Sequence, residues 1–274
     1  MPYATNPVDG VRTYFEDSGA AGPPVLIYTG FADPLEVAKS SGLARALSGE
    51  FRLIFADHRG QSGSDKPRER SAYALSTRVG DAVAVLDALG IRRAHFLGSS
   101  WGARLGFTFG EHAPRRVLSL VLCGNQPFAW DLESSTAQAV AAAIAASKQT
   151  GMRGFVETFE SALAYRSPEP ERTWTLEKND PAALEAAWRS AEVEGPISKE
   201  FSLWRAPCLI CVGEADEMHD AAKKAADEIP GARFVSLAGH SHISAFHEAD
   251  EQLLPHILQL LRSVAPNKES PRAS

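Results

Sequence analysis

The segment from Gly98 to Gly102, which reads Gly-Ser-Ser-Trp-Gly, constrains the fold of this chain more than any other part of the sequence. It directly follows the apolar run 94–97 and opens the stretch 101–112, which carries spaced apolar residues and no proline. A Gly-x-Ser-x-Gly turn between a buried strand and a helix is typical of a strained turn that exposes its serine, and its glycines let the neighbouring backbone pack closely. Ser100 is therefore the candidate nucleophile. The alternative, an ordinary loop rich in glycine and serine, accounts less well for the flanking strand and helix.

Short apolar runs alternate with segments of helical spacing along much of the chain. The pattern predicts helices over 35–47 and around 79–89, where Gly90 would end the helix. The expected strands are 11–15, 25–28, 53–56, 94–97, 117–122, 208–212 and 234–237. Continuous apolar runs that end in turn residues are typical of central parallel strands. The sequence thus predicts an α/β fold with a mostly parallel, doubly wound sheet that helices cover on both faces.

The alternation breaks between residues 127 and 205, where no run resembles a strand. Helices are expected there over 136–148, 155–163 and 181–191. We interpret 127–205 as a helical cap inserted into a core made of residues 1–126 and 206–264. The last core helix is expected over 249–264, and residues 265–274, with two prolines among mostly polar residues, are expected to form a flexible tail.

Candidate partners for Ser100 follow two later strands of the predicted sheet. A serine hydroxyl is a weak nucleophile without a base in hydrogen-bond reach and a third group that orients the base. Functional groups gather at the carboxyl ends of parallel strands, and Asp216 follows one of these ends closely. We predict Asp216 as the orienting acid, with Glu214 as the competitor and a solvated loop carboxylate as the structural alternative. Asp220 is a weaker candidate because it is expected to lie on the next helix.

Two histidines follow the last predicted strand. The turn 238–241 provides the residues needed to bring the His242 side chain back over the nucleophile, whereas His240 lies nearer the strand and could pack beside the site. We predict His242 as the base. A metal site made of His240, His242 and His247 is the alternative, but no cluster with zinc spacing accompanies these residues, and we expect no metal.

Backbone amides are the expected stabilisers of the oxyanion, because they need no reorganisation as charge develops. The amide of Trp101 follows the nucleophile, and a second amide would come from the loop 29–32, with Phe31 as the candidate. Gly30, Phe128 and Trp130 are predicted to contact substrate, and the aromatic residues of the cap suggest a mostly apolar one. The alternative is that these aromatic side chains pack the core of the cap.

Charge and composition exclude several classes of protein. The net charge is −6 and no basic run occurs, so we expect no nucleic-acid partner. No apolar stretch approaches the roughly 18–20 residues of a membrane helix, and the first residues lack a signal-peptide pattern, which favours a cytoplasmic protein that does not bind membranes. Cys208 and Cys211 would lie on opposite faces of a strand and act as small buried apolar residues. The oligomeric state stays open, a homo-oligomer included.

These motifs together resemble the α/β-hydrolase fold family over nearly the whole core. The loop Asp57–Asp65 resembles its structural D-x-R-G-x-G-x-S-D loop, Gly98–Gly102 its nucleophile elbow, and Gly213–Asp216 its acid turn. The segment Leu237–Phe246 is similar to the final histidine segment of small bacterial esterase-like members, which independently favours His242. The chain departs from the family at Thr29, where the family usually has histidine, and at Ala103, where it often has a second glycine.

The predicted function is that of a serine hydrolase that cleaves a small, mostly apolar ester or lactone through an acyl-enzyme, without a cofactor. Serine at the elbow argues against the dehalogenases and epoxide hydrolases of the family, which use an aspartate there. The alternatives are a C–C bond hydrolase or an aminopeptidase with the same triad, an acyltransferase, or a receptor that binds a small molecule with little turnover.

Overall fold

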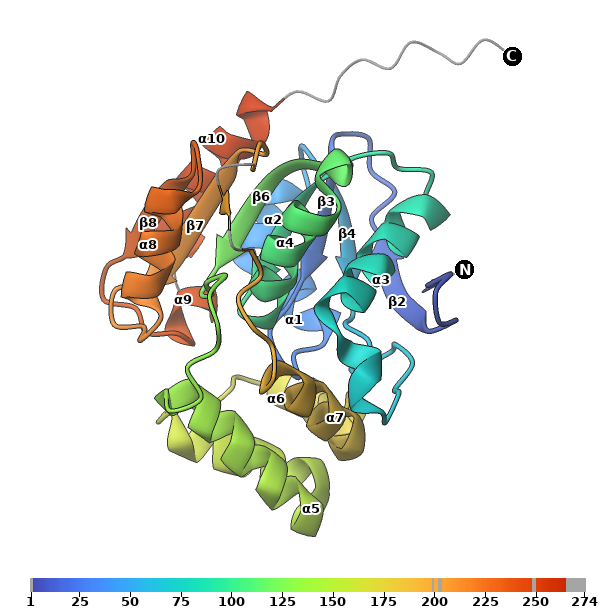
Figure 1. Cartoon of the computed structure of the whole chain (residues 1–274), viewed down its shortest axis with the longest axis vertical. Helices are drawn as coiled ribbons and strands as arrows, with labels where there is room; N and C mark the ends of the chain where they lie inside the picture. The colour runs from blue at the N-terminus through green and yellow to red at the C-terminus, as the bar shows by residue number, and fades with distance from the viewer. Residues whose placement is uncertain (1, 199, 202–203, 248–249, 265–274) are drawn as a thin grey trace.

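A twisted sheet forms the centre of the computed structural model, which describes residues 2–198, 200–201, 204–247 and 250–264 (Figure 1). Within these residues the sheet has eight strands in the order β1-β2-β4-β3-β5-β6-β7-β8. The strands are β1 Tyr3–Thr5, β2 Arg12–Asp17, β3 Pro24–Tyr28, β4 Arg52–Ala56, β5 Ala94–Ser99, β6 Val117–Cys123, β7 Cys208–Gly213 and β8 Arg233–Leu237. β2 pairs antiparallel with both of its neighbours, β1 and β4, and the remaining pairs are parallel, which confirms the predicted mostly parallel sheet. The short strand β1 was not expected, because three residues give too little alternation to detect.

Helices lie on both faces of the sheet and beyond one of its ends (Figure 1). They are α1 Leu35–Ser40, α2 Gly42–Leu47, α3 Leu75–Ala88, α4 Trp101–His112, α5 Ser135–Ala162, α6 Glu171–Lys178, α7 Pro181–Ala191, α8 His219–Glu228, α9 Ser244–His247 and α10 Asp250–Ser263, with 3₁₀ turns η1 Arg70–Tyr73 and η2 Pro114–Arg116. None of the helices in the described part of the chain is both long enough and apolar enough to cross a membrane.

Neighbouring residues of each central strand enter different apolar cores, as the period of two in a strand requires. Leu26 and Ile210 belong to a core with α3, α4 and α8, whereas Leu209 belongs to a core with α1, α2 and α10. Cys208 lies in the first core and Cys211 in the second, and both thiols are free and buried. Both faces of the sheet are therefore covered, which explains the uninterrupted apolar runs of the central strands.

The helix expected over 35–47 is divided in two at Ser41. This residue has extended backbone angles (φ −65°, ψ 154°), and its side chain accepts a hydrogen bond of 3.0 Å from the amide of Ala44. A serine in this position caps the amino end of the following helix, so the chain begins α2 where a continuous helix was expected.

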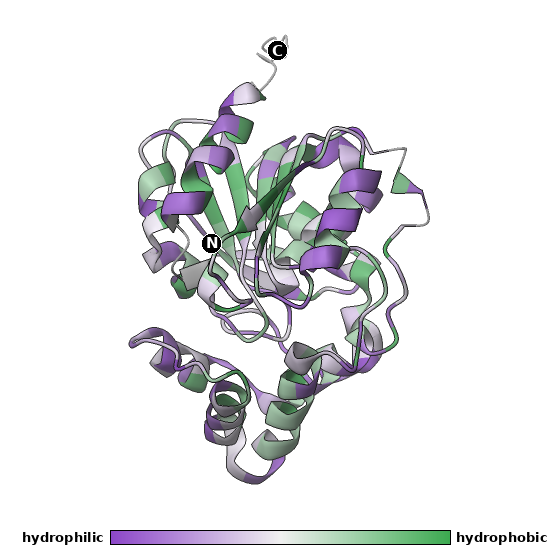
Figure 2. Cartoon of the chain, turned by 90° about the vertical axis from the view of Figure 1, so that its left-hand side faces the viewer, coloured by the Kyte–Doolittle hydropathy of each residue, from purple (hydrophilic) through white to green (hydrophobic). Residues whose placement is uncertain are grey.

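The segment between β6 and β7 carries α5, α6 and α7, and its described residues form no strand. These helices form a separate layer beyond the end of the sheet (Figures 1 and 2). The two helices expected over 136–148 and 155–163 form α5, which is interrupted at Thr150 and at Gly151 (φ 65°). Helix α6 was not expected, because prolines precede it closely and its sequence is polar. We propose that residues 127–205 act as a cap on a core of 1–126 and 206–264; the expected tail 265–274 lies outside the described residues.

Two histidines are buried in the core and held neutral. Burial lowers the pKa of His58 to about 3 and that of His95 to about 4. His95 contacts the Ser119 hydroxyl through Nδ1 (2.7 Å), and its Nε2 has no hydrogen-bond partner. Since an unfolded histidine has a pKa near 6.5, the unfolded chain binds protons that the folded protein does not bind as the pH falls. The stability that these neutral rings contribute is complete above pH 6.5 and declines as the pH falls toward their folded pKa values.

We expect His95→Asn to reduce this pH dependence. Asparagine can keep the contact with Ser119 but does not titrate, so the loss of unfolding free energy between pH 7 and pH 5 should be smaller than in the wild type by about 2 kcal/mol. Urea unfolding followed by tryptophan fluorescence at both pH values measures this difference. Equal losses in the two proteins would show that His95 is not the group that titrates.

Candidate active site

Ser100 occupies the turn between β5 and α4 in a backbone conformation that few non-glycine residues adopt (φ 49°, ψ −111°). Its amide donates to the Cys123 carbonyl (2.8 Å), and the Gly102 amide donates to the Thr29 carbonyl (2.9 Å). The Asn125 side chain donates to the Ser100 carbonyl (3.0 Å), a contact that the sequence did not indicate. Backbone strain of this kind persists only where surrounding contacts impose it, and these three hydrogen bonds do so.

The glycines of the motif are required by close packing of the backbone. A Cβ at Gly98 would lie 2.4 Å from the Gly102 carbonyl oxygen, and a Cβ at Gly102 would lie 2.3 Å from the Tyr28 carbonyl oxygen. Both distances are far below van der Waals contact with atoms that cannot move aside. Strand β5, the turn and α4 can therefore approach one another only with glycine on either side of Ser100.

The structure brings Ser100, His242 and Asp216 into one hydrogen-bonded series. Ser100 Oγ lies 3.0 Å from His242 Nε2, and His242 Nδ1 lies 2.8 Å from Asp216 Oδ2. The other carboxylate oxygen of Asp216 accepts from the Met218 amide at 2.9 Å. Since an ionised carboxylate only accepts, Nδ1 of His242 carries the proton and Nε2 is available to accept that of the serine hydroxyl.

Electrostatics keep Asp216 ionised. Burial raises its pKa, but the hydrogen bond and the charge of His242 outweigh burial and hold the pKa of the carboxyl below its usual value. Both side chains are buried, with exposed fractions of 5% for Asp216 and 7% for His242. A buried carboxylate aimed at the ring nitrogen can stabilise the imidazolium that forms when the serine gives up its proton.

The competing acid and histidine are engaged elsewhere. Glu214 accepts from the Gly239 amide at 3.2 Å, and His240 Nδ1 lies 3.3 Å from the Ser244 hydroxyl. Asp220 lies on α8 beside His219 (3.2 Å). The geometry therefore selects Asp216 and His242 as the partners of Ser100. The described residues include no group of three or more His, Cys, Asp or Glu side chains that could hold a metal ion.

The loop after β3 lies directly against the nucleophile. A Cβ at Gly30 would lie 3.7 Å from the Cβ of Ser100, and the rings of Phe31 and Trp101 pack at 5.1 Å between centroids. The Thr29 hydroxyl donates to the Asp33 carbonyl (2.6 Å) and closes the loop, which is what threonine provides at the position where the family usually has histidine.

The loop Asp57–Asp65 holds the loop after β3 in place. His58 Nε2 donates to the Thr29 carbonyl (3.0 Å), and Gln61 Oε1 accepts from the Ala32 amide (2.9 Å). Asp57 accepts from the amides of Leu35 (2.8 Å) and Gly63 (3.0 Å), and burial raises the pKa of its carboxyl to about 7. The motif therefore acts structurally, by fixing the backbone beside Ser100.

A cavity of about 70 Å³, which we call the catalytic cavity, contains both Ser100 and His242. Core and cap contribute to its walls, so a substrate bound there would contact both. The other lining residues are Gly30, Phe31, Asp33, Thr136, Val140, Phe159, Tyr165, Ser167, Glu171, Thr175 and Ile243. Gly30 and Phe31 thus lie where the sequence predicts, whereas Asp33 and Glu171 were not expected.

Phe128 and Trp130, which the sequence predicts as substrate contacts, are absent from the lining of the catalytic cavity. The Phe128 ring packs at 6.0 Å from Phe201, with the Lys224 ammonium 4.4 Å from its centroid. Trp130 stacks at 6.1 Å on Trp101, with the Arg104 guanidinium 5.1 Å from its ring. Both rings serve packing between the cap and the core, as the structural alternative held. The Trp101 ring is also buried among these groups and is absent from the cavity lining.

Comparison with known proteins identifies the family of the chain. The profile of the alpha/beta hydrolase fold family matches residues 23–207. A fluoroacetate dehalogenase from Burkholderia sp. is 26% identical over an alignment of 275 positions, gaps included, which covers 89% of this chain and 90% of that protein. A 2-hydroxymuconate semialdehyde hydrolase from Pseudomonas putida is 32% identical over 117 residues, which cover 42% of this chain and 41% of that protein.

Solved structures match over most of the chain. A hydrolase from Pseudomonas aeruginosa PA01 superimposes with a TM-score of 0.79 at 26% identity, covering 94% of this chain and 97% of that structure. An enol-lactonase from Burkholderia xenovorans LB400 has a TM-score of 0.78 at 20% identity, over 95% of this chain and 100% of that structure, and shares the fold. With a family profile that spans more than half of its length and this sheet topology, the chain belongs to the alpha/beta hydrolase fold family.

Proposed function

We propose that this protein is a serine hydrolase that cleaves a small, mostly apolar carboxylic ester or lactone through an acyl-enzyme. The observation that carries the proposal is the series Ser100–His242–Asp216, with contacts of 3.0 Å and 2.8 Å, in a cavity that core and cap line together. Contacts of this length allow a proton to move from the hydroxyl to the imidazole as the serine attacks.

In the proposed reaction, Ser100 Oγ forms a bond to the carbonyl carbon while His242 Nε2 takes the hydroxyl proton. The carbonyl oxygen becomes an oxyanion, to which the amides of Phe31 and Trp101 would donate. The C–O bond to the leaving alcohol then breaks as His242 returns the proton to it. Water, deprotonated by the same imidazole, attacks the acyl-enzyme and releases the acid and the serine. Asp216 holds the ring and stabilises its charged form in both halves.

A serine nucleophile does not suit the dehalogenation reaction for which the dehalogenase relative is named. Displacement at an alkyl carbon by Ser100 would leave an ether, and the side chains at the site offer no step that cleaves an ether. An attack by serine is productive at a carbonyl carbon, where the product is an ester that water can hydrolyse. The similarity to a C–C bond hydrolase over 42% of the chain favours cleavage beside a ketone as the second candidate, since it also proceeds at a carbonyl.

Active-site labelling together with a substrate panel tests the proposed function. A fluorophosphonate should label the folded wild-type protein at Ser100, located by peptide mass spectrometry. Short-chain p-nitrophenyl esters or a γ-lactone should be turned over, and an acyl-enzyme should be detectable by intact mass after rapid quenching. Turnover of a vinylogous 1,5-diketone without ester turnover would favour the second candidate. A folded protein that the fluorophosphonate does not label would contradict an activated serine and leave a binding role.

A further inference from the structure

The two segments that join the cap to the core run side by side (Figure 1). We call residues 124–134, which follow β6, the first linker, and residues 192–198, which follow α7, the second linker. The Ile197 amide of the second linker donates to the Pro127 carbonyl of the first at 2.8 Å. A side chain that binds both linkers therefore fixes the place where the cap leaves the core.

Arg104 is such a side chain. It lies on α4 one helical turn after Trp101, and it is fully buried. Its Nη1 donates to the carbonyls of Gln126 (2.9 Å) and Phe128 (2.5 Å), and its Nη2 donates to that of Gly195 (3.1 Å). The planar guanidinium carries its donors in a fixed fork and can reach several acceptors at once. Arg104 thus binds both linkers to the helix that begins at the nucleophile.

Glu194 of the second linker connects Arg104 to a second buried arginine. Its carboxylate lies 3.7 Å from Arg104 Nε and 3.8 Å from Nη1 of Arg78, which belongs to α3. Within the described part of the chain the Arg78 nitrogens have no hydrogen-bond partner, and the guanidinium lies 4.3 Å from the centroid of the Trp101 ring. We call Arg78, Arg104 and Glu194 the arginine cluster. A buried ion cluster adds little net stability compared with apolar side chains of the same volume, so stability is a weak reason for its presence.

The side chains of both proposed oxyanion donors pack against the cap. The Trp101 ring stacks on Trp130 of the first linker, with 6.1 Å between the centroids. The Phe31 ring packs against Phe155 and Trp188 at 6.3 Å and 6.1 Å. Because each ring is attached to the residue whose amide would bind the oxyanion, a shift of the cap moves the amides as well.

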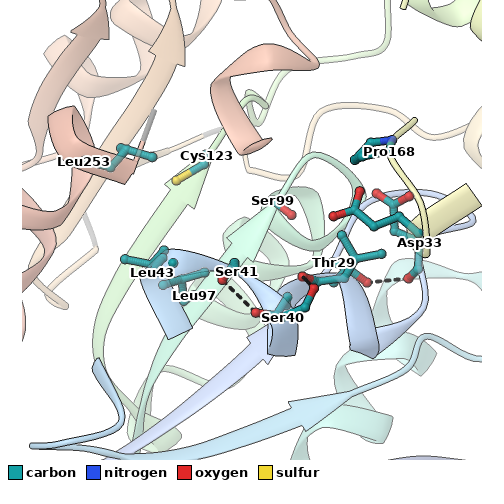
Figure 3. A pocket seen from close by; sticks show the side chains of 14 residues that line it. Thr29, Asp33, Ser40, Ser41, Leu43, Leu97, Ser99, Cys123, Pro168 and Leu253 are labelled. Carbon is teal, nitrogen blue, oxygen red and sulfur yellow. Dashed lines mark hydrogen bonds between the residues drawn. The ribbon is translucent and has the colours of Figure 1, made fainter. Parts of the chain in front are cut away.

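The loop that carries Phe31 borders a second cavity. This side cavity has a volume of about 270 Å³ and shares Asp33 and Glu171 with the lining of the catalytic cavity. Figure 3 shows Thr29 and Asp33 at one end of it, with the hydrogen bond from the Thr29 hydroxyl to the Asp33 carbonyl drawn as a dashed line. Phe31 does not line the side cavity, and its ring packs against Trp101 and the cap instead. The position of Phe31 therefore depends on these contacts.

We propose that Arg104 and Glu194 are positioning residues for the oxyanion. They hold the linkers on α4 and, together with Arg78, hold the Trp101 ring, so that the placement of the cap sets the positions of the Trp101 and Phe31 amides. This inference rests on the proposed function, in which these two amides bind the oxyanion. Loosening the arginine cluster should therefore weaken binding of the transition state more than binding of the ester.

Arg104→Lys tests the kinetic consequence. Lysine keeps the charge but replaces the fork with a single ammonium group, which cannot span the carbonyls of both linkers. For p-nitrophenyl butyrate, kcat should fall by about 10- to 100-fold while KM changes by less than about threefold. Glu194→Gln should act in the same direction. Glu192→Gln, which removes an exposed carboxylate from the same linker, is the matched control and should leave both constants unchanged.

Two ketones of matched size separate a positioning role from a merely structural one. Ser100 Oγ forms a bond to the carbonyl carbon of 1,1,1-trifluoro-2-hexanone, the hydroxyl proton passes to His242, and the carbonyl oxygen becomes an oxyanion. The parent compound 2-hexanone occupies the same space without forming this adduct. In Arg104→Lys the inhibition constant of the trifluoroketone should rise by the factor by which kcat/KM falls, and that of 2-hexanone should stay within about twofold.

Thermal unfolding shows which variants are folded. Glu194→Gln leaves two buried guanidinium groups without a carboxylate, so if it does not fold, Arg78→Met/Glu194→Gln, which removes one charge of each sign, takes its place. Folded variants that keep kcat and trifluoroketone affinity within twofold, or that lose affinity for both ketones equally, would overturn the inference and leave the proposed function intact. A folded wild type that neither hydrolyses the ester nor binds the trifluoroketone would contradict the proposed function, and the inference with it.

Discussion

Replacing Ser100 with alanine should reduce ester hydrolysis by about 10⁴-fold or more and abolish fluorophosphonate labelling. The substitution removes the hydroxyl oxygen that lies 3.0 Å from His242 Nε2 and leaves the hydrogen bonds of the backbone in place. A positive φ of 49° is as unfavourable for alanine as for serine, so the substitution adds no backbone strain. The loss should therefore appear in kcat rather than in folding.

The measurement compares kcat and KM for p-nitrophenyl butyrate in the two proteins, with thermal unfolding as the test that the variant is folded. An unchanged melting temperature with turnover lost identifies Ser100 as the nucleophile. Retention of more than a small fraction of the activity would instead show that hydrolysis occurs at another group, and the assignment of the whole series would fail with it.

The sheet could be predicted from the sequence because the apolar pattern that marks each strand lies within that strand. Strands β3 to β7 are mostly buried on both faces, and the apolar runs that form them end close to the observed strand ends. The convergence of Ser100, Asp216 and His242 then follows from a general rule, that parallel strands present their carboxyl ends at one edge. The helix expected over 35–47 departs from expectation at a single residue, because Ser41 caps a new helix there.

The walls of the cavities could not be predicted in the same way. Aromatic residues of the cap are suited both to a pocket and to a core, and their sequence does not say which neighbours they meet. Phe159 and Tyr165 line the catalytic cavity, whereas Phe128 and Trp130 pack between layers. Asp33 could have been considered, since it lies three residues after Gly30 in the same loop.

Nothing in the sequence indicated that Glu171 lines the catalytic cavity, because its position depends on where the cap lies relative to the core. The structure shows that contact directly: Asn179 of the cap donates to the Ala32 carbonyl (2.8 Å) and accepts from the Ser62 amide (3.2 Å). These bonds tie the cap to the loop that flanks Ser100. The walls of the cavity therefore depend on contacts between segments far apart in sequence, whereas the topology of the sheet places Ser100, Asp216 and His242 together.

Asp216→Asn should lower kcat by about 10⁴-fold with little change in KM. Asparagine has the size of aspartate, and its carbonyl oxygen can still accept from the Met218 amide. Its NH₂ group would then face His242 Nδ1, so Nδ1 would have to accept a hydrogen bond instead of donating one. The imidazole proton would then lie on Nε2 and point at Ser100 Oγ, so the ring could no longer take the hydroxyl proton. The negative charge that stabilises the imidazolium would also be lost.

Glu214→Gln is the matched control, because Glu214 lies two residues away and was the competing acid in the sequence. Its exposed carboxylate accepts from the Gly239 amide (3.2 Å), away from His242, so kcat should stay within about twofold of the wild type. Steady-state kinetics with p-nitrophenyl butyrate on both variants distinguishes the two acids. A large loss in Glu214→Gln with kcat retained in Asp216→Asn would transfer the orienting role to Glu214. The opposite result assigns it to the buried carboxylate that already lies 2.8 Å from the ring.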